Sequence, residues 1–217
     1  MNGPIKKNHF IWLTTAMIGL VIVNELSREM PENLTLSLVQ YTSWSLLLLS
    51  LLSLKTTRVW GKGSVVLIGL MLLVIYMGGA TDGLYYEYAY LALLLVFLLS
   101  ATWIVGSQVL LTGSVDLNII IGSVALYLLI GLTWSLFYTI LLEFSPGALS
   151  GVQVSTWYDN IPVTNYFSFV TLTTLGYGDI SPVTPVARLL VVFEAVTGMF
   201  YLAVIVASLV GAIRNKS

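Results

Sequence analysis

Long apolar blocks with almost no charge set the strongest limit on what this chain can fold into. Five of them approach or exceed the ~20 residues that a helix needs to cross a bilayer. They cover residues 34–54, 63–80, 88–111, 117–142 and 186–213. A shorter sixth block, residues 10–26, follows Lys6 and Lys7 as a secretory signal would, but Asn24-Glu25-Leu26 stands where a small-residue cleavage pattern is expected. We interpret it as a retained first span, which gives six transmembrane segments.

Composition agrees with this interpretation and decides the type of spanning element. Hydrophobic residues make up 58% of the chain and charged residues 9%, against roughly 25% charged residues in soluble domains. The apolar residues form continuous blocks rather than the alternating pattern of barrel strands, so each span should satisfy its backbone hydrogen bonds as a helix. The sequence therefore predicts an all-α membrane protein.

Several classes of function lack the residues that they need. The chain has no cysteine and a single histidine, His9, which excludes disulfides, thiolate metal sites and a histidine-based catalytic triad. The net charge is -1 and no basic run is longer than Lys6-Lys7, so we expect no nucleic-acid partner. An intramembrane enzyme would need a pair of facing catalytic groups, whereas the last span carries only Glu194. We expect neither an enzyme nor a cofactor.

The distribution of basic residues predicts the orientation of the chain in the cell membrane. With six spans and a cytoplasmic N-terminus, seven of the nine lysines and arginines lie inside, as the positive-inside rule requires. These are Lys6, Lys7, Lys55, Arg58, Lys62, Arg214 and Lys216, against Arg28 and Arg188 outside. Both termini are then expected to be cytoplasmic.

The extracellular stretch between the fifth and sixth spans has two parts. Residues 143–160 are polar and rich in Gly, Ser and Pro, which predicts a loop. Residues 163–174 are apolar and rich in threonine, too short to cross the membrane but suited to a re-entrant helix. Non-helical backbone at membrane depth is tolerated only where protein buries it or where it lines a water-filled path, so this segment suggests a pore.

The residues that follow this half-helix have the chemistry of a narrow cation path. Carbonyl groups that line a pore in succession need alternating right- and left-handed backbone, and glycine adopts the left-handed form without a Cβ penalty. Gly176 and Gly178 are spaced two apart, as this alternation demands. The carbonyls of Thr174 to Tyr177 and the Thr174 hydroxyl could then replace the hydration shell of a cation.

The stretch Thr173-Thr174-Leu175-Gly176-Tyr177-Gly178-Asp179 resembles the potassium channel pore family, whose filter reads Thr-Val-Gly-Tyr-Gly. The resemblance extends without a gap over residues 163–213. It implies that Thr174, Leu175, Gly176, Tyr177 and Gly178 form a selectivity filter that binds potassium ions through the backbone carbonyls of residues 174–177. Four filters must meet on one axis, so the resemblance also implies a homotetramer.

Further residues take roles by the same resemblance. Tyr166 is expected to hydrogen-bond Asp179 and so support the filter, and the end of the pore helix at Thr173 should point its negative dipole end at the ion. Val170 stands where some relatives have glutamate, so no carboxylate pair is expected behind the filter. On the inner helix, Gly198 aligns with a hinge glycine. The residues expected to face the inner cavity are Met199, Leu202 and Val206.

The chain also departs from the family. Leu175 replaces the usual valine, which bears on packing behind the filter and on inactivation. Residues 86–110, the fourth span, contain no lysine or arginine, although voltage sensing needs several charges there. We therefore expect a sensor-like domain without gating charges at residues 1–111, a pore domain at residues 112–217, and little voltage dependence. The short linker at residues 112–116 favours an arrangement without domain swapping, and no regulatory domain is expected on this chain.

Alternatives remain at two residues and for the function as a whole. Glu194 is either a proton-sensitive site one turn before Gly198 or a structural carboxyl that is hydrogen-bonded behind the pore helix. Gly198 is either a hinge or a packing glycine. The main function is expected to be passive, potassium-selective conduction. A cation channel of relaxed selectivity is the alternative, and a potassium transporter subunit is a further one, disfavoured because the chain has one filter-like segment.

Overall fold

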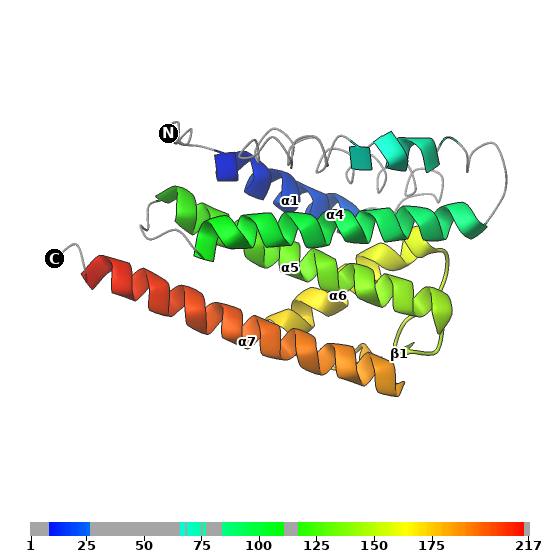
Figure 1. Ribbon diagram of the computed structural model, residues 1–217. Coiled ribbons are helices and arrows are strands. Elements are labelled where there is room, and N and C mark those ends of the chain that lie inside the picture. Colours follow the sequence, from blue (N-terminus) through cyan, green and yellow to red (C-terminus); the bar gives the residue numbers. More distant parts are fainter. Residues whose placement is uncertain are drawn as a thin grey trace. The chain divides into compact units, whose positions relative to one another are not determined.

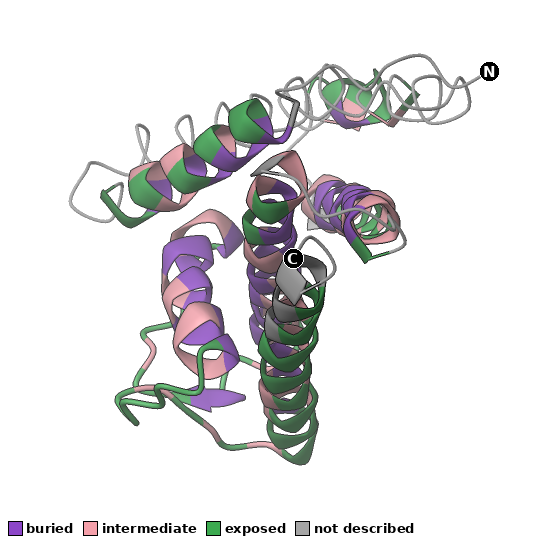
Figure 2. Cartoon of the chain, turned by 90° about the vertical axis from the view of Figure 1, so that its left-hand side faces the viewer, coloured by how far each residue is buried: buried purple, intermediate pink, exposed green. Residues whose placement is uncertain are grey.

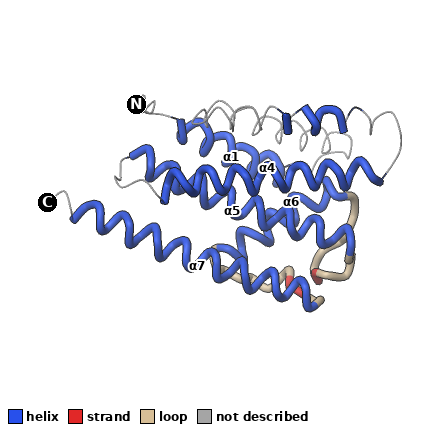
Figure 3. The backbone as a smooth tube through the Cα atoms, in the orientation of Figure 1, coloured by secondary structure: helices blue, strands red, loops and turns tan. Residues whose placement is uncertain are grey.

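The computed structural model describes residues 9–26, 84–110 and 117–214, together with most of residues 66–76. Its helices and strands are shown in Figure 1 and Figure 3, where helices account for most of the described backbone. The elements are α1 (His9–Leu26), α4 (Leu84–Leu110), α5 (Leu117–Phe144), β1 (Leu149–Ser150), α6 (Trp157–Leu172), β2 (Ser181–Pro182) and α7 (Pro185–Arg214).

Four of the six predicted spans appear as helices. Residues 85–110, 118–144 and 185–205 are long and apolar enough to cross a membrane, and α1 is a shorter apolar helix. The predicted span at 34–54 lies outside the described residues, as do half of the predicted span at 63–80 and the predicted domain boundary between residues 111 and 112. Helix length and composition thus mark a membrane protein.

The chain divides into two compact units. One comprises Met1–Leu20 and Ser43–Leu129, and the other Val21–Thr42 and Ile130–Ser217. Within the first unit, Thr14 of α1 donates a hydrogen bond to the Ile121 carbonyl of α5 at 3.3 Å. The second unit contains the later part of α5 and all of α6, β1, β2 and α7, and every candidate functional residue lies in it.

Helix α6 begins earlier than the sequence predicts. The predicted half-helix covers 163–174 after a loop at 143–160, whereas the observed helix runs from Trp157 to Leu172. Pro162 lacks an N–H but does not end the helix, because the turn before it is held in place. Trp157 and Asn160 are buried, and the Asn160 side chain accepts from the Ser155 N–H and donates to the Ser155 carbonyl, both at 3.2 Å. Burial and these bonds offset the one bond that Pro162 cannot make.

Strands β1 and β2 of the second unit form a short antiparallel pair. Leu149 pairs with Pro182 and Ser150 with Ser181, and the two serine hydroxyls lie 2.8 Å apart. This pairing ties the loop after α5 to the segment before α7. A buried apolar cluster lies next to it, formed by Tyr138, Leu142, Ala148, Leu149, Phe167 and Ala187.

Helix α7 is buried along a narrow stripe only. In Figure 2 the helix that ends beside the label C is drawn mostly in the colour of exposed residues. Its buried positions are Ala187, Glu194 and Gly198, spaced seven and four residues apart and therefore on one face of the helix. That face packs against α6, which Figure 1 shows as the shorter yellow helix between α5 and α7.

Candidate functional site

The backbone after α6 alternates in handedness. Thr174, Gly176 and Gly178 have φ angles of 59°, 59° and 81°, so every second residue of this stretch lies in the left-handed region. The spacing of the glycines predicts this alternation for residues 176 and 178. Thr174 extends it by one residue, although a β-branched side chain is strained in this conformation.

The left-handed conformation of Thr174 follows from the way in which α6 ends. The Leu175 N–H donates to the Val170 carbonyl at 3.0 Å, and the Thr174 N–H donates to the Thr171 carbonyl at 2.9 Å. These two bonds form a Schellman motif with Thr173 as the C-cap and Thr174 in the position that glycine usually takes. The end of α6 and the start of the alternating stretch are therefore one hydrogen-bonded structure.

The end of this stretch is held by a side-chain bond and by a close backbone contact. The Tyr166 hydroxyl donates to Asp179 Oδ2 at 2.7 Å, which is the bond that the family resemblance implies. It holds the pKa of the Asp179 carboxyl below its usual range. On the other side Gly151, with a φ of 79°, leaves room for the Asp179 carbonyl oxygen, which a Cβ would meet. Sequence reasoning missed Gly151, although a glycine in a polar loop can mark a left-handed backbone position or a close backbone contact.

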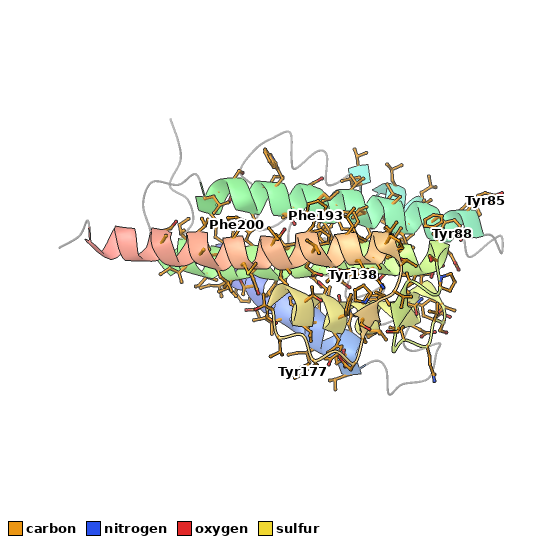
Figure 4. All side chains as sticks on the ribbon, turned by 90° about the horizontal axis from the view of Figure 1, so that it is seen from below. Tyr85, Tyr88, Tyr138, Tyr177, Phe193 and Phe200 are labelled. Atoms are coloured by element: carbon orange, nitrogen blue, oxygen red, sulfur yellow. The ribbon has the colours of Figure 1, made fainter. Side chains whose placement is uncertain are left out.

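Side chains in the middle of the stretch project away from their own chain. Leu175 is 56% exposed and Tyr177 is 66% exposed, and Figure 4 shows Tyr177 at the edge of the helices. Large apolar side chains that are exposed this far indicate a contact surface for lipid or protein. By contrast, Tyr138, also labelled in Figure 4, is fully buried.

The predicted residues of the inner helix differ in their exposure. Met199 and Leu202 are exposed, and the side chain of Val206 lies outside the described ones. Gly198 is buried against the end of α6, where a Cβ would meet the Leu172 carbonyl oxygen. This close approach gives Gly198 a packing role, and α7 continues through it without a break.

Glu194 is buried, unlike Met199 and Leu202. Its side chain is fully buried, and its two carboxyl oxygens meet Tyr138 of α5 and Ser168 of α6. Of the two alternatives left open by the sequence, this geometry fits the structural carboxyl behind α6. The sequence did not identify Tyr138 or Ser168 as its partners, because two polar residues in apolar helices give no indication of which residue they face.

A second buried polar group connects α5 to α6. The Thr164 hydroxyl lies 3.0 Å from the Ser135 hydroxyl and 2.8 Å from the Thr139 hydroxyl, and all three residues are buried. Sequence reasoning missed this cluster as well. The spacing of Ser135 and Thr139, one helical turn apart in an apolar helix, was the available signal.

Comparison with known families agrees with the location of these features. Residues 119–215 match the model of a family described as "Ion channel", a stretch that includes nearly all of α5, the whole of α6 and α7, and the alternating segment between them. No curated protein and no solved structure shows a significant match. The match and the apolar helices together support an ion channel.

Proposed function

We propose that this chain is a potassium-selective channel that conducts ions passively as a homotetramer in the cell membrane, with little or no voltage dependence. The observation that carries the proposal is the alternating backbone at Thr174, Gly176 and Gly178, directly after the half-length helix α6. Alternating handedness allows successive carbonyls to point the same way. Four such segments around one axis would offer rings of oxygen atoms that replace the hydration shell of potassium.

In this arrangement α6 is the re-entrant pore helix and residues 174–178 are the selectivity filter. The C-terminal end of α6 contributes the negative end of its dipole, which favours a cation nearby. Asp179 and Tyr166 then brace the outer end of the filter through their 2.7 Å bond. No cofactor and no nucleic acid takes part in this mechanism.

Exposed apolar surface in the single chain supports a tetramer. Among the α7 residues whose burial is described, only Ala187, Glu194 and Gly198 are buried within the chain, and large side chains such as Phe193 and Phe200 are exposed. Lipid can cover part of this surface, but the filter residues Leu175 and Tyr177 need protein neighbours if the segment lines an aqueous path. Further copies of this chain would supply these neighbours.

The composition of α4 supports weak voltage dependence. The helix runs from Leu84 to Leu110, and Glu87 in the first turn is its only Asp, Glu, Lys, Arg or His residue. A voltage sensor moves several charges through the membrane field, and each one gains about 2.3 kcal/mol per 100 mV. Without such charges the opening equilibrium has little coupling to voltage. Six spans with both termini in the cytoplasm complete the proposed topology.

Potassium flux into liposomes tests the proposal. Purified protein is reconstituted under a potassium gradient, alongside Gly178→Ala and the matched control Gly147→Ala. Alanine is strained at the left-handed Gly178, whereas Gly147 has open space around it and no positive φ. We expect flux in the wild type and in Gly147→Ala, and its loss in Gly178→Ala. Absence of wild-type flux, or flux that survives Gly178→Ala, would contradict the filter assignment.

The alternative of relaxed selectivity rests on Leu175, which stands where related filters have valine. Reversal potentials in mixed potassium and sodium distinguish the two functions. A reversal potential that follows the potassium gradient supports selective conduction. One that lies near zero under opposed gradients identifies a channel that admits both ions.

A further inference from the structure

Glu194 has no part in the conduction path described above, yet it is the one acidic residue buried in the second unit among the described residues. Its Oε2 atom accepts a hydrogen bond from the Tyr138 hydroxyl at 2.6 Å. Its Oε1 atom lies 2.5 Å from the Ser168 hydroxyl. One side chain on α7 therefore contacts both α5 and α6.

The Ser168 hydroxyl lies within hydrogen-bond distance of two oxygen atoms. Besides Glu194 Oε1, it lies 2.7 Å from the Gly131 carbonyl oxygen of α5. A hydroxyl has one proton to donate, and a backbone carbonyl can only accept. If Ser168 donates to Gly131, a proton between Ser168 and Glu194 has to come from the glutamate.

The opposite assignment leaves a contact unexplained. If Glu194 were ionised, Ser168 would donate to it, and the short approach of Ser168 to the Gly131 carbonyl would join two acceptors with no proton between them. A protonated Glu194 satisfies every contact at once. Tyr138 donates to Glu194, Glu194 donates to Ser168, and Ser168 donates to Gly131.

The electrostatic surroundings point the same way. Among the described residues, Tyr138 is the only titratable group that faces Glu194 from α5, and α6 contributes only the Ser168 hydroxyl. On α7 the basic residue Arg188 lies six positions earlier and donates to the Pro182 carbonyl at 3.4 Å instead. A buried carboxylate without a cation is costly inside a membrane protein, whereas a neutral acid with two hydrogen-bonding neighbours, Tyr138 and Ser168, is not.

We propose that Glu194 is a neutral carboxylic acid that positions the pore helix, through a relay of hydrogen bonds from Tyr138 to Glu194, from Glu194 to Ser168, and from Ser168 to the Gly131 carbonyl. The relay joins α7 to α6 and both to α5. Ser168 lies six residues before Thr174, about 9 Å along the chain at the helical rise. Ionisation of Glu194 removes the proton of the middle bond, so α6 and the alternating segment that it carries lose this support.

Infrared spectroscopy tests the proton directly, whether or not the protein conducts. We compare the reconstituted wild type with Glu194→Gln, and with Asp179→Asn as a control for an ionised carboxyl. At neutral pH the wild-type minus Glu194→Gln spectrum should show the carbonyl band of a protonated acid, and the wild-type minus Asp179→Asn spectrum should show carboxylate bands. Ser168→Ala should shift the acid band, because its acceptor is removed. A carboxylate band for Glu194 at neutral pH would overturn the proposal.

Potassium flux tests the positioning role, which rests on the proposed function. Glutamine supplies the same acceptor and donor as the neutral acid, so Glu194→Gln should keep flux within about twofold of the wild type, whereas Glu194→Leu should lower it about tenfold or more. From about pH 6 to about pH 10, flux should decline in the wild type but not in Glu194→Gln, since only the acid can ionise.

The outcomes separate the two proposals. Loss of flux or of assembly in Glu194→Gln as severe as in Glu194→Leu overturns the positioning role, because glutamine preserves the relay. A wild type that carries no potassium but shows the acid band refutes the proposed function and leaves the proton on Glu194 supported. If potassium flux has the same pH profile in the wild type and in Glu194→Gln, ionisation of Glu194 is not what breaks the hydrogen bonds of the relay.

Discussion

Gly198→Ala is the substitution whose effect the structure defines best. An added Cβ would meet the Leu172 carbonyl oxygen, would lie 3.0 Å from the Leu172 carbonyl carbon, and would lie 3.2 Å from its Cδ1 atom. Backbone atoms at the end of a helix cannot rotate away as the end of a long side chain can. To reach ordinary van der Waals separation, α6 and α7 have to move apart by roughly 1 Å at this point.

The expected cost follows from two opposing contributions. Overpacking of a close contact typically costs about 1–3 kcal/mol. Alanine in a helix returns about 1 kcal/mol relative to glycine. We therefore expect Gly198→Ala to lower the free energy of unfolding by up to about 2 kcal/mol. Gly106→Ala on α4 is the matched control, because its Cβ would lie 3.7 Å from Leu126 Cδ1, an ordinary contact, and should be neutral or mildly stabilising.

The assay is unfolding by SDS titrated into mixed micelles, followed by far-ultraviolet circular dichroism, for the wild type and both variants. Gly198→Ala should unfold at a lower SDS fraction than the wild type, and Gly106→Ala should not. If Gly198→Ala unfolds together with Gly106→Ala, the close approach of α7 to the Leu172 carbonyl is not a packing constraint.

Three further predictions concern other contacts. Tyr166→Phe should raise the pKa of Asp179 towards its usual value, because the hydrogen bond that lowers it is lost. In the wild type this bond stabilises the folded protein at pH values above the usual pKa of aspartate, and the stabilisation is lost as the pH falls through the lowered pKa. A carbon NMR titration of the Asp179 carboxyl measures this pKa, and an unchanged pKa would contradict the prediction. Thr164→Val should lower the free energy of unfolding by about 1–2 kcal/mol, because it leaves the buried Ser135 hydroxyl without its partner, whereas the exposed Ser208→Ala should be neutral; equal SDS midpoints would refute the cluster's role. Currents should vary little with voltage because α4 carries no basic residue, and steep activation in a voltage-step series would show that a sensor lies elsewhere.

Features that depend on local sequence could be predicted. Apolar blocks near the length of a bilayer predict α1, α4, α5 and α7, because such a segment in lipid has no option but a helix. Glycines two residues apart predict the left-handed backbone at residues 176 and 178. The bond from Tyr166 to Asp179 could be expected from the resemblance alone, since thirteen residues separate the two and neither has a local signal that points to the other.

Features that depend on tertiary packing could not be predicted. The polar composition of residues 143–160 and the apolar run from residue 163 predicted a later helix start, but burial of Trp157 and the side-chain bonds of Asn160 extend the helix back to residue 157. The left-handed Thr174 is another example, because threonine has a low preference for that conformation and the Schellman bonds at the end of α6 impose it. In both cases a tertiary or capping interaction overrode the local preference of the sequence.

The hinge and packing roles of Gly198 are compatible once the burial of α7 is considered along its length. The buried positions Ala187, Glu194 and Gly198 attach the first half of the helix to its own chain, whereas every residue after Gly198 with described burial is at least partly exposed. A helix held up to one point and free beyond it bends at that point. We infer that the last packed residue of α7 sets the pivot of any gating motion, so spin labels at residue 208 should move between closed and open states while labels at residue 190 stay in place. Equal displacement of the two labels would mean that α7 moves as a rigid body, and that the contacts of Glu194 and Gly198 break when the channel opens.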